Sequence, residues 1–228
     1  MQVRMTNFPS LRLNVGSVYD FKRRKAATKE PETVEWLRSC LQRFGPFFLI
    51  DVGANVGGYS LIACALHEAC HAVAIEPFPP TFLTLCKNIV ANDYSGRITP
   101  INAMVAESGA GRSLPLHFSR WTSGIAEHKA SGRHKIMIPT IDGTALAKYA
   151  VGVGAVICKI DVDGAEELVI EALRNLLLDQ SVRSVLVEIE DDQMEKISAL
   201  LGQAGFGIRQ RYSKPGRSQS NVIAERDG

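Results

Sequence analysis

The stretch Asp51-Val-Gly53-Ala-Asn55-Val-Gly57-Gly58-Tyr59 decides the fold of this chain. It follows the apolar run 47–50 and leads into the helix-like segment 60–66, which gives the order strand, glycine-bearing turn, helix. Gly53 and Gly57 have no Cβ atom, so a ligand can approach the backbone of the turn. The first N–H groups of the helix point to the same place, because they have no partner inside the helix. The stretch therefore predicts a ligand site between strand and helix.

A carboxylate ends the next apolar strand. Residues 72–75 are apolar and are followed by Glu76, nineteen residues after Gly57. An acid at the tip of the second strand of an α/β sheet holds the two ribose hydroxyls of a nucleotide. The dinucleotide pattern G-x-G-x-x-G fails, since Asn55 replaces its second glycine. Asp51 opens the turn, and it suits the ammonium of an amino acid, directly or through water, better than a pyrophosphate. Together these features predict S-adenosylmethionine rather than NAD.

Size and composition indicate a globular α/β protein. The chain has 228 residues, 46% of them hydrophobic, which is enough for a sizeable core. No apolar run approaches the roughly 20 residues that span a bilayer. Residues 1–9 also lack the pattern of a signal peptide. The five cysteines show no C-x-x-C spacing, so we expect reduced thiols and a cytoplasmic location.

Basic residues gather at both ends of the chain. Residues 1–30 carry seven lysines or arginines against two acids, and residues 205–228 carry five against two. A basic rim attracts an anionic acceptor, such as a phosphorylated sugar or a nucleic acid. The interpretation we favour is plainer: residues 1–30 form a loosely ordered, solvated lead-in, and residues 31–228 form a single domain.

Strand-like and helix-like segments alternate along this domain. We expect strands near 47–52, 71–76, 98–104, 156–161 and 183–189, and helices near 31–44, 58–68, 79–92, 142–149, 164–178 and 191–204. Such alternation predicts a doubly wound, mostly parallel α/β sheet. The link between strands 206–212 and 221–225 is too short for a crossover, so these two should pair antiparallel. A seven-stranded sheet with an antiparallel last strand is the arrangement of class I methyltransferases.

Residues 106–135 interrupt the alternation. They are rich in glycine, serine, histidine and arginine. So long a loop inside a compact domain is usually functional or mobile, and substrate contact and an ordinary surface excursion both remain open. Trp121 and His117 are the candidate substrate contacts, since an aromatic face commonly packs on a sugar ring. His128 is a further candidate in the same loop, although solvent exposure is favoured for both histidines.

Four segments resemble the FkbM family of S-adenosylmethionine-dependent methyltransferases. They are residues 51–60, 76–92, 159–166 and 186–189. The block Lys159-Ile-Asp161-Val-Asp163-Gly-Ala-Glu166 is the family-specific one, with Asp163 where the family usually has Glu. The resemblance implies O-methylation of hydroxyl groups on sugars, on glycolipid or oligosaccharide decorations, or on polyketide rings.

Three candidate catalytic groups should meet at the carboxyl ends of the strands, where ligands of open α/β sheets bind. Asp161 ends the fourth strand, Lys159 lies two residues earlier on the same side, and Glu188 ends the fifth. A carboxylate there can take the proton of an acceptor hydroxyl. The open alternatives are a buried ion pair for Lys159 and a helix N-cap for Asp161. Asn102, at the end of the third strand, is expected to read the edge of adenine.

Other functions remain open beside this one. Acids on these strand ends bind Mg²⁺ in some methyltransferases, but only two are well placed, so we favour a metal-free site. A ribose 2′-O-methyltransferase of RNA fits the basic ends, yet no strip of alternating basic and aromatic residues is present to stack bases. A non-catalytic module that binds the cofactor is the third possibility. We expect a carbohydrate or other small-molecule acceptor.

Overall fold

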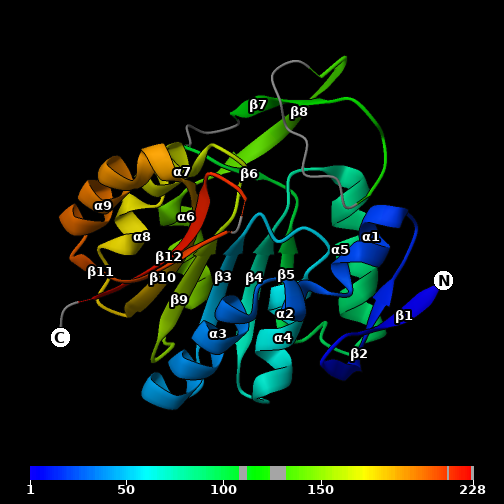
Figure 1. Ribbon diagram of the computed structural model, residues 1–228, viewed down its shortest axis with the longest axis horizontal. Coiled ribbons are helices and arrows are strands. Elements are labelled where there is room, and N and C mark those ends of the chain that lie inside the picture. Colours follow the sequence, from blue (N-terminus) through cyan, green and yellow to red (C-terminus); the bar gives the residue numbers. More distant parts are fainter. Residues whose placement is uncertain (108–111, 124–131, 215, 227–228) are drawn as a thin grey trace.

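A seven-stranded sheet forms the centre of the computed structural model, which describes residues 1–107, 112–123, 132–214 and 216–226 (Figure 1). The strand order is β11-β12-β10-β9-β3-β4-β5. These strands are β3 (Phe48–Val52), β4 (His71–Ile75), β5 (Ile98–Ile101), β9 (Val156–Ile160), β10 (Val182–Glu190), β11 (Phe206–Ser213) and β12 (Gln219–Arg226). β12 is antiparallel to β10 and β11, whereas β3, β4, β5, β9 and β10 pair in parallel. The predicted sheet with its antiparallel last strand is confirmed.

Helices cover both faces of this sheet. One face carries α3 (Pro31–Phe44), α4 (Gly58–Leu66) and α5 (Pro79–Ala91). The other carries α6 (Gly143–Ala147), α7 (Glu166–Ala172), α8 (Arg174–Leu177) and α9 (Met194–Gln203), with the 3₁₀ turns Lys148–Ala150 and Asp191–Gln193. Successive strand residues alternate between the faces, so Leu49 packs with the first group of helices and Ile50 with the second. Within the described ranges, no helix combines the length and apolar character needed to cross a membrane.

Local signals in the sequence explain where several elements begin and end. All five residues of β3 are buried, as expected for a central parallel strand covered on both faces. Pro31 and Pro79 stand at the first helical positions of α3 and α5, where the missing N–H of proline costs nothing. Gly45 ends α3 with a φ of 73°. The expected helix 164–178 is divided in two, because α7 ends at Ala172 and α8 begins at Arg174.

Residues 1–30 are not the loosely ordered lead-in that their charge predicts. They form the hairpin β1 (Gln2–Met5) and β2 (Phe8–Asn14) and the short helices α1 (Val18–Arg23) and α2 (Ala26–Lys29). Leu11 and Leu13 are buried in the core beside α4 and α5. Asn92, the residue directly after α5, exchanges two hydrogen bonds of 2.8 Å with the backbone of Arg12, which fixes β2 to the end of that helix. The apolar alternation of β2 therefore outweighs the basic composition of the segment.

Residues 106–135 are likewise not one long loop. The structure forms a three-stranded sheet from β6 (Met104–Val105), β7 (Ser113–Phe118) and β8 (His134–Ile141), in the order β6-β8-β7. β7 and β8 extend beyond the carboxyl ends of β3, β4 and β5 (Figure 1). Residues 108–111 and 124–131, with the candidate His128, lie outside the described residues. The part that is described places a hairpin above the end of the sheet where ligands are expected.

Candidate active site

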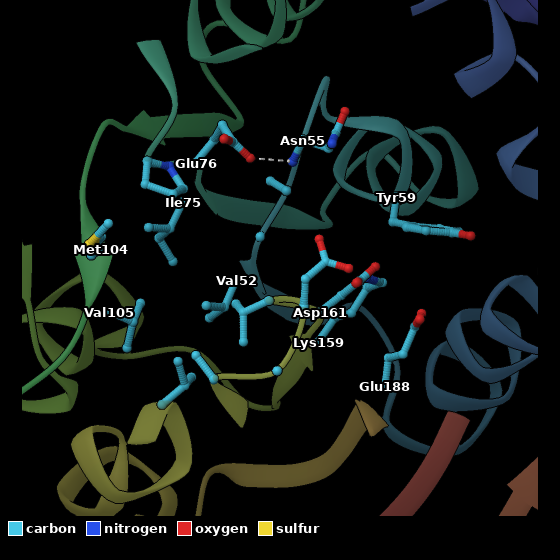
Figure 2. A pocket seen from close by; sticks show the side chains of 18 of the residues that line it. Val52, Asn55, Tyr59, Ile75, Glu76, Met104, Val105, Lys159, Asp161 and Glu188 are labelled. Carbon is cyan, nitrogen blue, oxygen red and sulfur yellow. Dashed lines mark hydrogen bonds and ion pairs between the residues drawn. The ribbon is translucent and has the colours of Figure 1, made fainter. Parts of the chain in front are cut away.

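A cavity of about 790 Å³ lies at the carboxyl ends of the parallel strands. Its size falls in the range of about 300–1,000 Å³ that is usual for small-molecule sites. One end is apolar and is lined by Val52, Ile75, Met104 and Val105. The other end is charged and is lined by Glu30, Lys159, Asp161 and Glu188. Figure 2 shows the two ends side by side, with Glu76 and Asn55 above the apolar one. The cavity can therefore hold an aromatic base and a polar reacting group in one ligand.

The glycines of the turn serve the packing of the protein. Gly53 and Gly57 have φ values of 78° and 85°, a conformation that glycine adopts readily. A Cβ atom on Gly53 would lie 1.9 Å from the carbonyl oxygen of Asp161, and one on Gly57 would lie 2.5 Å from Cδ1 of Leu85. Both glycines thus make room for the protein itself, at the end of β9 and at α5, and the expected approach of a ligand to them stays a prediction. Gly53 lines the cavity, whereas Gly57 does not.

Glu76 lies at the tip of β4 and faces the turn. Its side chain is buried, and its two oxygens accept hydrogen bonds from the backbone N–H groups of Phe78 (2.9 Å) and Asn55 (3.0 Å). Asn55 has a φ of 52°, which asparagine tolerates better than most residues. Burial raises the pKa of Glu76 to about 7, although the two N–H donors act in the opposite direction. Each carboxylate oxygen keeps a second lone pair that can accept from a ligand hydroxyl.

Asp51 lies below the floor of the cavity and is not among the residues that line it. Its Oδ2 atom accepts a hydrogen bond of 2.6 Å from the hydroxyl of Ser60, and its Oδ1 atom has no partner among the described residues. Burial raises the pKa of Asp51, and the ammonium of Lys159 acts against that rise. Asp51 thus has no direct exposure to the cavity, so contact with a ligand, directly or through water, stays a prediction, while its charge influences the nearby Lys159.

Asn102 holds the chain after β4. Its amide nitrogen donates to the carbonyl oxygens of Glu76 (2.8 Å) and Pro77 (2.9 Å), and its side chain does not line the cavity. This position favours a role in fixing the loop that carries Glu76 over direct contact with an adenine edge. Residues 103–106 line the apolar end instead. No sequence signal marked them, because apolar residues of these kinds also fill ordinary cores.

Lys159 is buried in the wall of the charged end. Its Nζ atom donates to Oδ2 of Asp161 at 2.8 Å and lies 4.9 Å from the centre of the Tyr59 ring. Burial alone would lower the pKa of Lys159, but the charges of Asp161, Asp51 and Glu30 raise it above its ordinary value. The three carboxylates therefore favour the protonated form of this lysine. Asp161 does not cap α7, whose N-cap is Ala165, so the helix-cap alternative for Asp161 is not what the structure shows.

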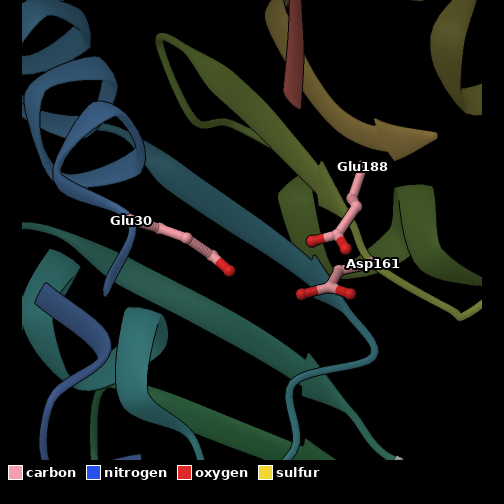
Figure 3. A group of neighbouring side chains, drawn as sticks. All are labelled: Glu30, Asp161 and Glu188. Carbon is pink, nitrogen blue, oxygen red and sulfur yellow. The ribbon is translucent and has the colours of Figure 1, made fainter. Parts of the chain in front are cut away.

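Glu30 completes a group of three carboxylates at this end of the cavity (Figure 3). One oxygen atom each of Glu30, Asp161 and Glu188 lies within 4.8 Å of the others. Glu30 precedes α3, whereas Asp161 follows β9 and Glu188 belongs to β10. The side chain of Asp161 is 27% exposed, compared with 14% for Glu188 and 7% for Glu30. Asp161 is therefore the carboxylate that a ligand in the cavity can reach most easily.

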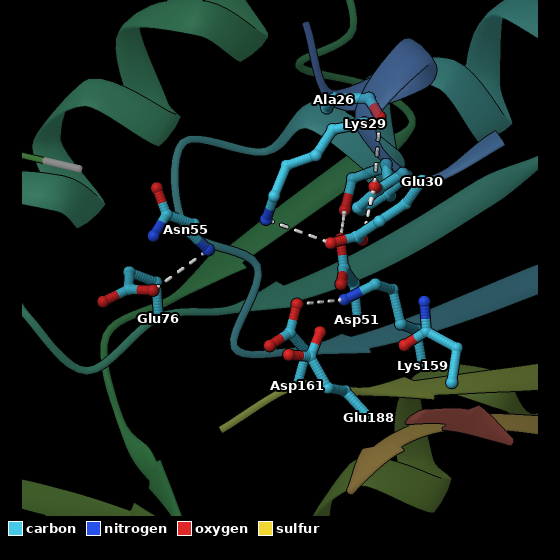
Figure 4. Close-up of polar contacts among 12 residues, drawn as sticks. Ala26, Lys29, Glu30, Asp51, Asn55, Glu76, Lys159, Asp161 and Glu188 are labelled. Atoms are coloured by element: carbon cyan, nitrogen blue, oxygen red, sulfur yellow. Dashed lines mark hydrogen bonds and ion pairs between the residues drawn. The ribbon is translucent and has the colours of Figure 1, made fainter. Parts of the chain in front are cut away.

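Lys214 and Tyr59 hold the other two carboxylates. Lys214 Nζ lies 3.0 Å from Oε1 of Glu30 and also donates to Glu188, and the Tyr59 hydroxyl donates to Oε2 of Glu30 at 2.7 Å. Figure 4 shows Glu30, Lys159, Asp161 and Glu188 as one group of neighbouring charges. Burial alone would raise the pKa of Glu30, but the nearby lysines bring it down to about 2. The pKa of Glu188 is raised by burial and by Asp161. The surroundings thus favour protonation of Glu188 and ionisation of Glu30.

The two predicted substrate contacts occupy different places. His117 of β7 lines the cavity. Trp121 is 60% exposed and does not line it. The Trp121 ring instead packs on Phe78 and Phe118, at centroid distances of 5.4 and 5.3 Å. Trp121 therefore supports the hairpin that carries His117.

The architecture described above is the class I methyltransferase fold. The chain is similar to the putative methyltransferase yhhF of Escherichia coli, with a TM-score of 0.56 and 16% identity over 100% of this chain and 99% of that one. It is also similar to magnesium protoporphyrin IX methyltransferase (ChlM) of Synechocystis PCC 6803, solved with bound SAM. There the TM-score is 0.56 and the identity 14%, over 94% of this chain and 86% of that one. At such low identity, these similarities show the fold alone.

Sequence similarity identifies the family within that class. Residues 51–208 match the methyltransferase FkbM domain, so the chain belongs to the FkbM methyltransferase family and the predicted membership is confirmed. The hexuronic acid methyltransferase AglP of Haloferax volcanii is 30% identical over 182 residues, 78% of this chain and 70% of the relative. Methyltransferase 1 of Beauveria bassiana is 27% identical over 209 residues, 79% of this chain and 81% of the relative. Glu30 and Lys214 lie outside the range that matches the family domain.

Proposed function

We propose that this protein transfers the methyl group of S-adenosylmethionine to a hydroxyl group of a sugar, a glycan or a related small molecule. One observation carries the proposal: the carboxylates of Glu30, Asp161 and Glu188 converge within 4.8 Å in the cavity that Glu76 and the turn also line. Membership of a methyltransferase family supports the reaction class. A relative described as a hexuronic acid methyltransferase supports a carbohydrate acceptor.

The residues fit this cofactor. Glu76 would hold the ribose hydroxyls, because both its oxygens keep a free lone pair and its backbone partners fix its position. The apolar end formed by Val52, Ile75 and residues 103–106 would take the adenine ring. The cationic methionine part would then point to the acidic end, where Asp161 lies. When bound there, S-adenosylmethionine supplies an electrophilic methyl group.

The charged end can then receive the proton of the acceptor. The acceptor oxygen attacks the methyl carbon, the carbon–sulfur bond breaks as the carbon–oxygen bond forms, and the hydroxyl proton passes to a carboxylate. We assign that proton to Asp161, the most exposed of the three, with Glu188 beside it as a second base of raised pKa. Lys159 orients Asp161 through their hydrogen bond. Glu30 orients Lys214 and Tyr59.

We propose that the transfer does not need a metal ion. An all-oxygen set of three carboxylates is of the type that Mg²⁺ binds. However, Lys159 and Lys214 already donate to these same carboxylates and offset most of their charge. Two ammonium groups at the site oppose the approach of a divalent cation.

Calorimetry tests the cofactor assignment. We expect S-adenosylmethionine and S-adenosylhomocysteine to bind and NAD not to bind. Glu76→Ala should weaken the binding of S-adenosylmethionine and of S-adenosylhomocysteine by about 2–3 kcal/mol, the usual loss for charge-assisted hydrogen bonds. Glu68→Ala, the same change at an exposed position after α4, is the matched control and should bind normally. Binding of NAD, or unchanged affinity in Glu76→Ala, would overturn the assignment.

Mass spectrometry tests the reaction. The protein is incubated with S-adenosylmethionine that carries a deuterated methyl group and with a panel of acidic glycans, neutral glycans, nucleotides and RNA. We expect the label on a hydroxyl oxygen of a glycan. Label on RNA alone would indicate a ribose 2′-O-methyltransferase, and cofactor binding with no transfer to any class would indicate a non-catalytic module. Either result would contradict the proposal.

A further inference from the structure

The acceptor end of the active-site cavity continues into a second cavity. This second cavity has a volume of about 610 Å³ and lies between the start of α3 and the β11–β12 hairpin. It shares Lys29, Glu30 and Arg217 with the first cavity. Because Glu30 is also one of the three converging carboxylates, the second cavity begins where we propose that the acceptor hydroxyl reacts.

Basic side chains dominate the lining of the second cavity. They are Lys29, Arg211, Lys214 and Arg217. The acids that line it are Glu30 and Glu32, and both are engaged by neighbours: Glu30 accepts from Lys214 and Tyr59, and Glu32 accepts from the amide of Asn221 at 2.7 Å. The excess of positive charge attracts anions.

Two of these cations stand at the boundary between the cavities. The side chain of Lys29 is 54% exposed, and Arg217 is exposed as well. Both therefore reach solvent where the two cavities meet. Arg211 is held by Asp191 at 2.8 Å, and Lys29 donates to Oε1 of Glu30 at 3.2 Å. Lys29 keeps two of its three ammonium donors for a ligand, and Arg217 has no acidic partner among the described residues. A guanidinium offers a carboxylate or phosphate two parallel hydrogen bonds.

The residues that line the second cavity lie outside the part of the chain that matches the family domain. Lys29 precedes residue 51 and Arg217 follows residue 208, so both lie outside the part of the chain that matches the family domain. The second cavity is thus built by segments of this chain that the family domain does not include. Such segments are suited to the choice of acceptor, whereas the shared domain provides the cofactor turn.

We infer that the acceptor is a chain of at least two sugar units and that it carries an oxyanion next to the methylated unit. This inference rests on the proposed function. The reacting hydroxyl lies among Glu30, Asp161 and Glu188, and the carboxylate or phosphate of the neighbouring unit binds in the second cavity against Lys29 and Arg217. The acceptor is therefore selected by its charge and by its length.

Calorimetry with two matched pairs of probes tests this inference, in the presence of saturating S-adenosylhomocysteine. The first pair is the trimer of galacturonic acid and its carboxyl-reduced, neutral counterpart, and the second is lactose 1-phosphate and lactose. We expect the anionic member of at least one pair to bind about tenfold more tightly than the neutral one, as one charge-assisted contact gives. Tighter binding of the anionic member in the first pair identifies a carboxylate as the bound group. Tighter binding of the anionic member in the second pair identifies a phosphate. No preference in either pair overturns the inference.

Variants of Arg217 locate the effect. Arg217→Ala should remove most of the preference for the anionic probe, and Arg217→Lys should retain part of it because the charge remains. Arg174→Ala is the control, because Arg174 belongs to α8 and no residue of α8 lines either cavity. This variant should keep the full preference for the anionic probe. An anionic preference that persists in Arg217→Ala would contradict the assigned site. Binding of S-adenosylhomocysteine is the separate check: its failure would refute the proposed function, whereas its success with no anionic preference would refute this inference alone.

Discussion

A Cβ atom on Gly53 would lie 1.9 Å from the carbonyl oxygen of Asp161. The turn after β3 and the end of β9 are thus in contact with no room for a methyl group between them. The backbone N–H of Asp161 also donates to the carbonyl of Val52 at 3.0 Å. The segment that we propose to bind the cofactor and the residue that we propose to accept the proton are therefore held at a fixed separation, as an in-line transfer requires.

Substitution of Gly53 by alanine measures this contact. Gly152 is the matched control, since its φ is also 78° and a Cβ atom there would meet nothing within 4 Å. Gly152→Ala should cost about 1–2 kcal/mol, because an L-residue is strained in the left-handed region. Gly53→Ala should cost about 1–3 kcal/mol more, from the added clash with the backbone of Asp161. Urea unfolding of both variants measures this difference in the free energy of unfolding. Equal stability of Gly53→Ala and Gly152→Ala would show that the turn after β3 and the end of β9 move apart easily.

Replacement of Asp161 by asparagine separates chemistry from binding. The side chain keeps its shape but loses the charge that takes the hydroxyl proton, so kcat should fall by about 10²-fold or more. The affinity for S-adenosylhomocysteine should change little. Asp192→Asn makes the same change at an exposed position and should retain full activity. Normal turnover by Asp161→Asn would refute the assignment of the proton to this residue.

A chelator decides between the metal-free site and the metal site. Wild-type activity should survive EDTA, because Lys159 and Lys214 already offset the charge of the three carboxylates. Activity that is lost in EDTA and restored by Mg²⁺ alone would instead identify Glu30, Asp161 and Glu188 as metal ligands.

The central part of the fold could be predicted because its signals are local. β3 and β4 are continuous apolar runs, α3 and α5 begin with proline, and the turn from Asp51 to Tyr59 joins strand to helix. The apolar spacing within β2 was also present, but the basic residues around it favoured a solvated arm. Its two hydrogen bonds with the side chain of Asn92 depend on a tertiary contact that the local pattern does not show.

The candidate site was predicted in part, for a similar reason. Asp161, Lys159 and Glu188 follow from strand alternation and from the rule that ligands bind at strand ends. Glu30 and Lys214 are 184 positions apart in the chain and meet at 3.0 Å only in the folded protein. Neither belongs to a motif, so nothing near them in the sequence marks them as partners of the strand-end acids.

The ionisation of Glu76 should make cofactor binding depend on pH. Burial raises its pKa to about 7, so the free protein holds this carboxyl increasingly protonated as the pH falls below 7. The ionised form is the better acceptor for ribose hydroxyls. The affinity for S-adenosylhomocysteine should therefore rise between pH 6 and pH 8, and binding at pH 7 should release about half a proton. Calorimetry in buffers of different ionisation enthalpy measures that proton.

Glu76→Gln is the control for this titration, because an amide has no proton to lose in this range. Its affinity should be low at pH 8 and nearly constant down to pH 6. A pH dependence that is the same in Glu76→Gln and in the wild type would assign the titrating group to another residue, for instance Asp163, whose pKa burial raises to about 6.

Trp121 should affect the acceptor rather than the cofactor. Its ring packs on Phe118, at the end of the strand that carries His117 into the cavity. Trp121→Ala removes that support and should raise the KM for the acceptor by about 2- to 10-fold, the scale of an aromatic contact. Trp121→Phe keeps a ring and should behave nearly as the wild type, and His117→Ala should raise the same KM. Trp121 also packs on Phe78, whose N–H donates to Glu76. If Trp121→Ala instead lost affinity for S-adenosylhomocysteine and kept its KM for the acceptor, this ring would serve the cofactor side of the site.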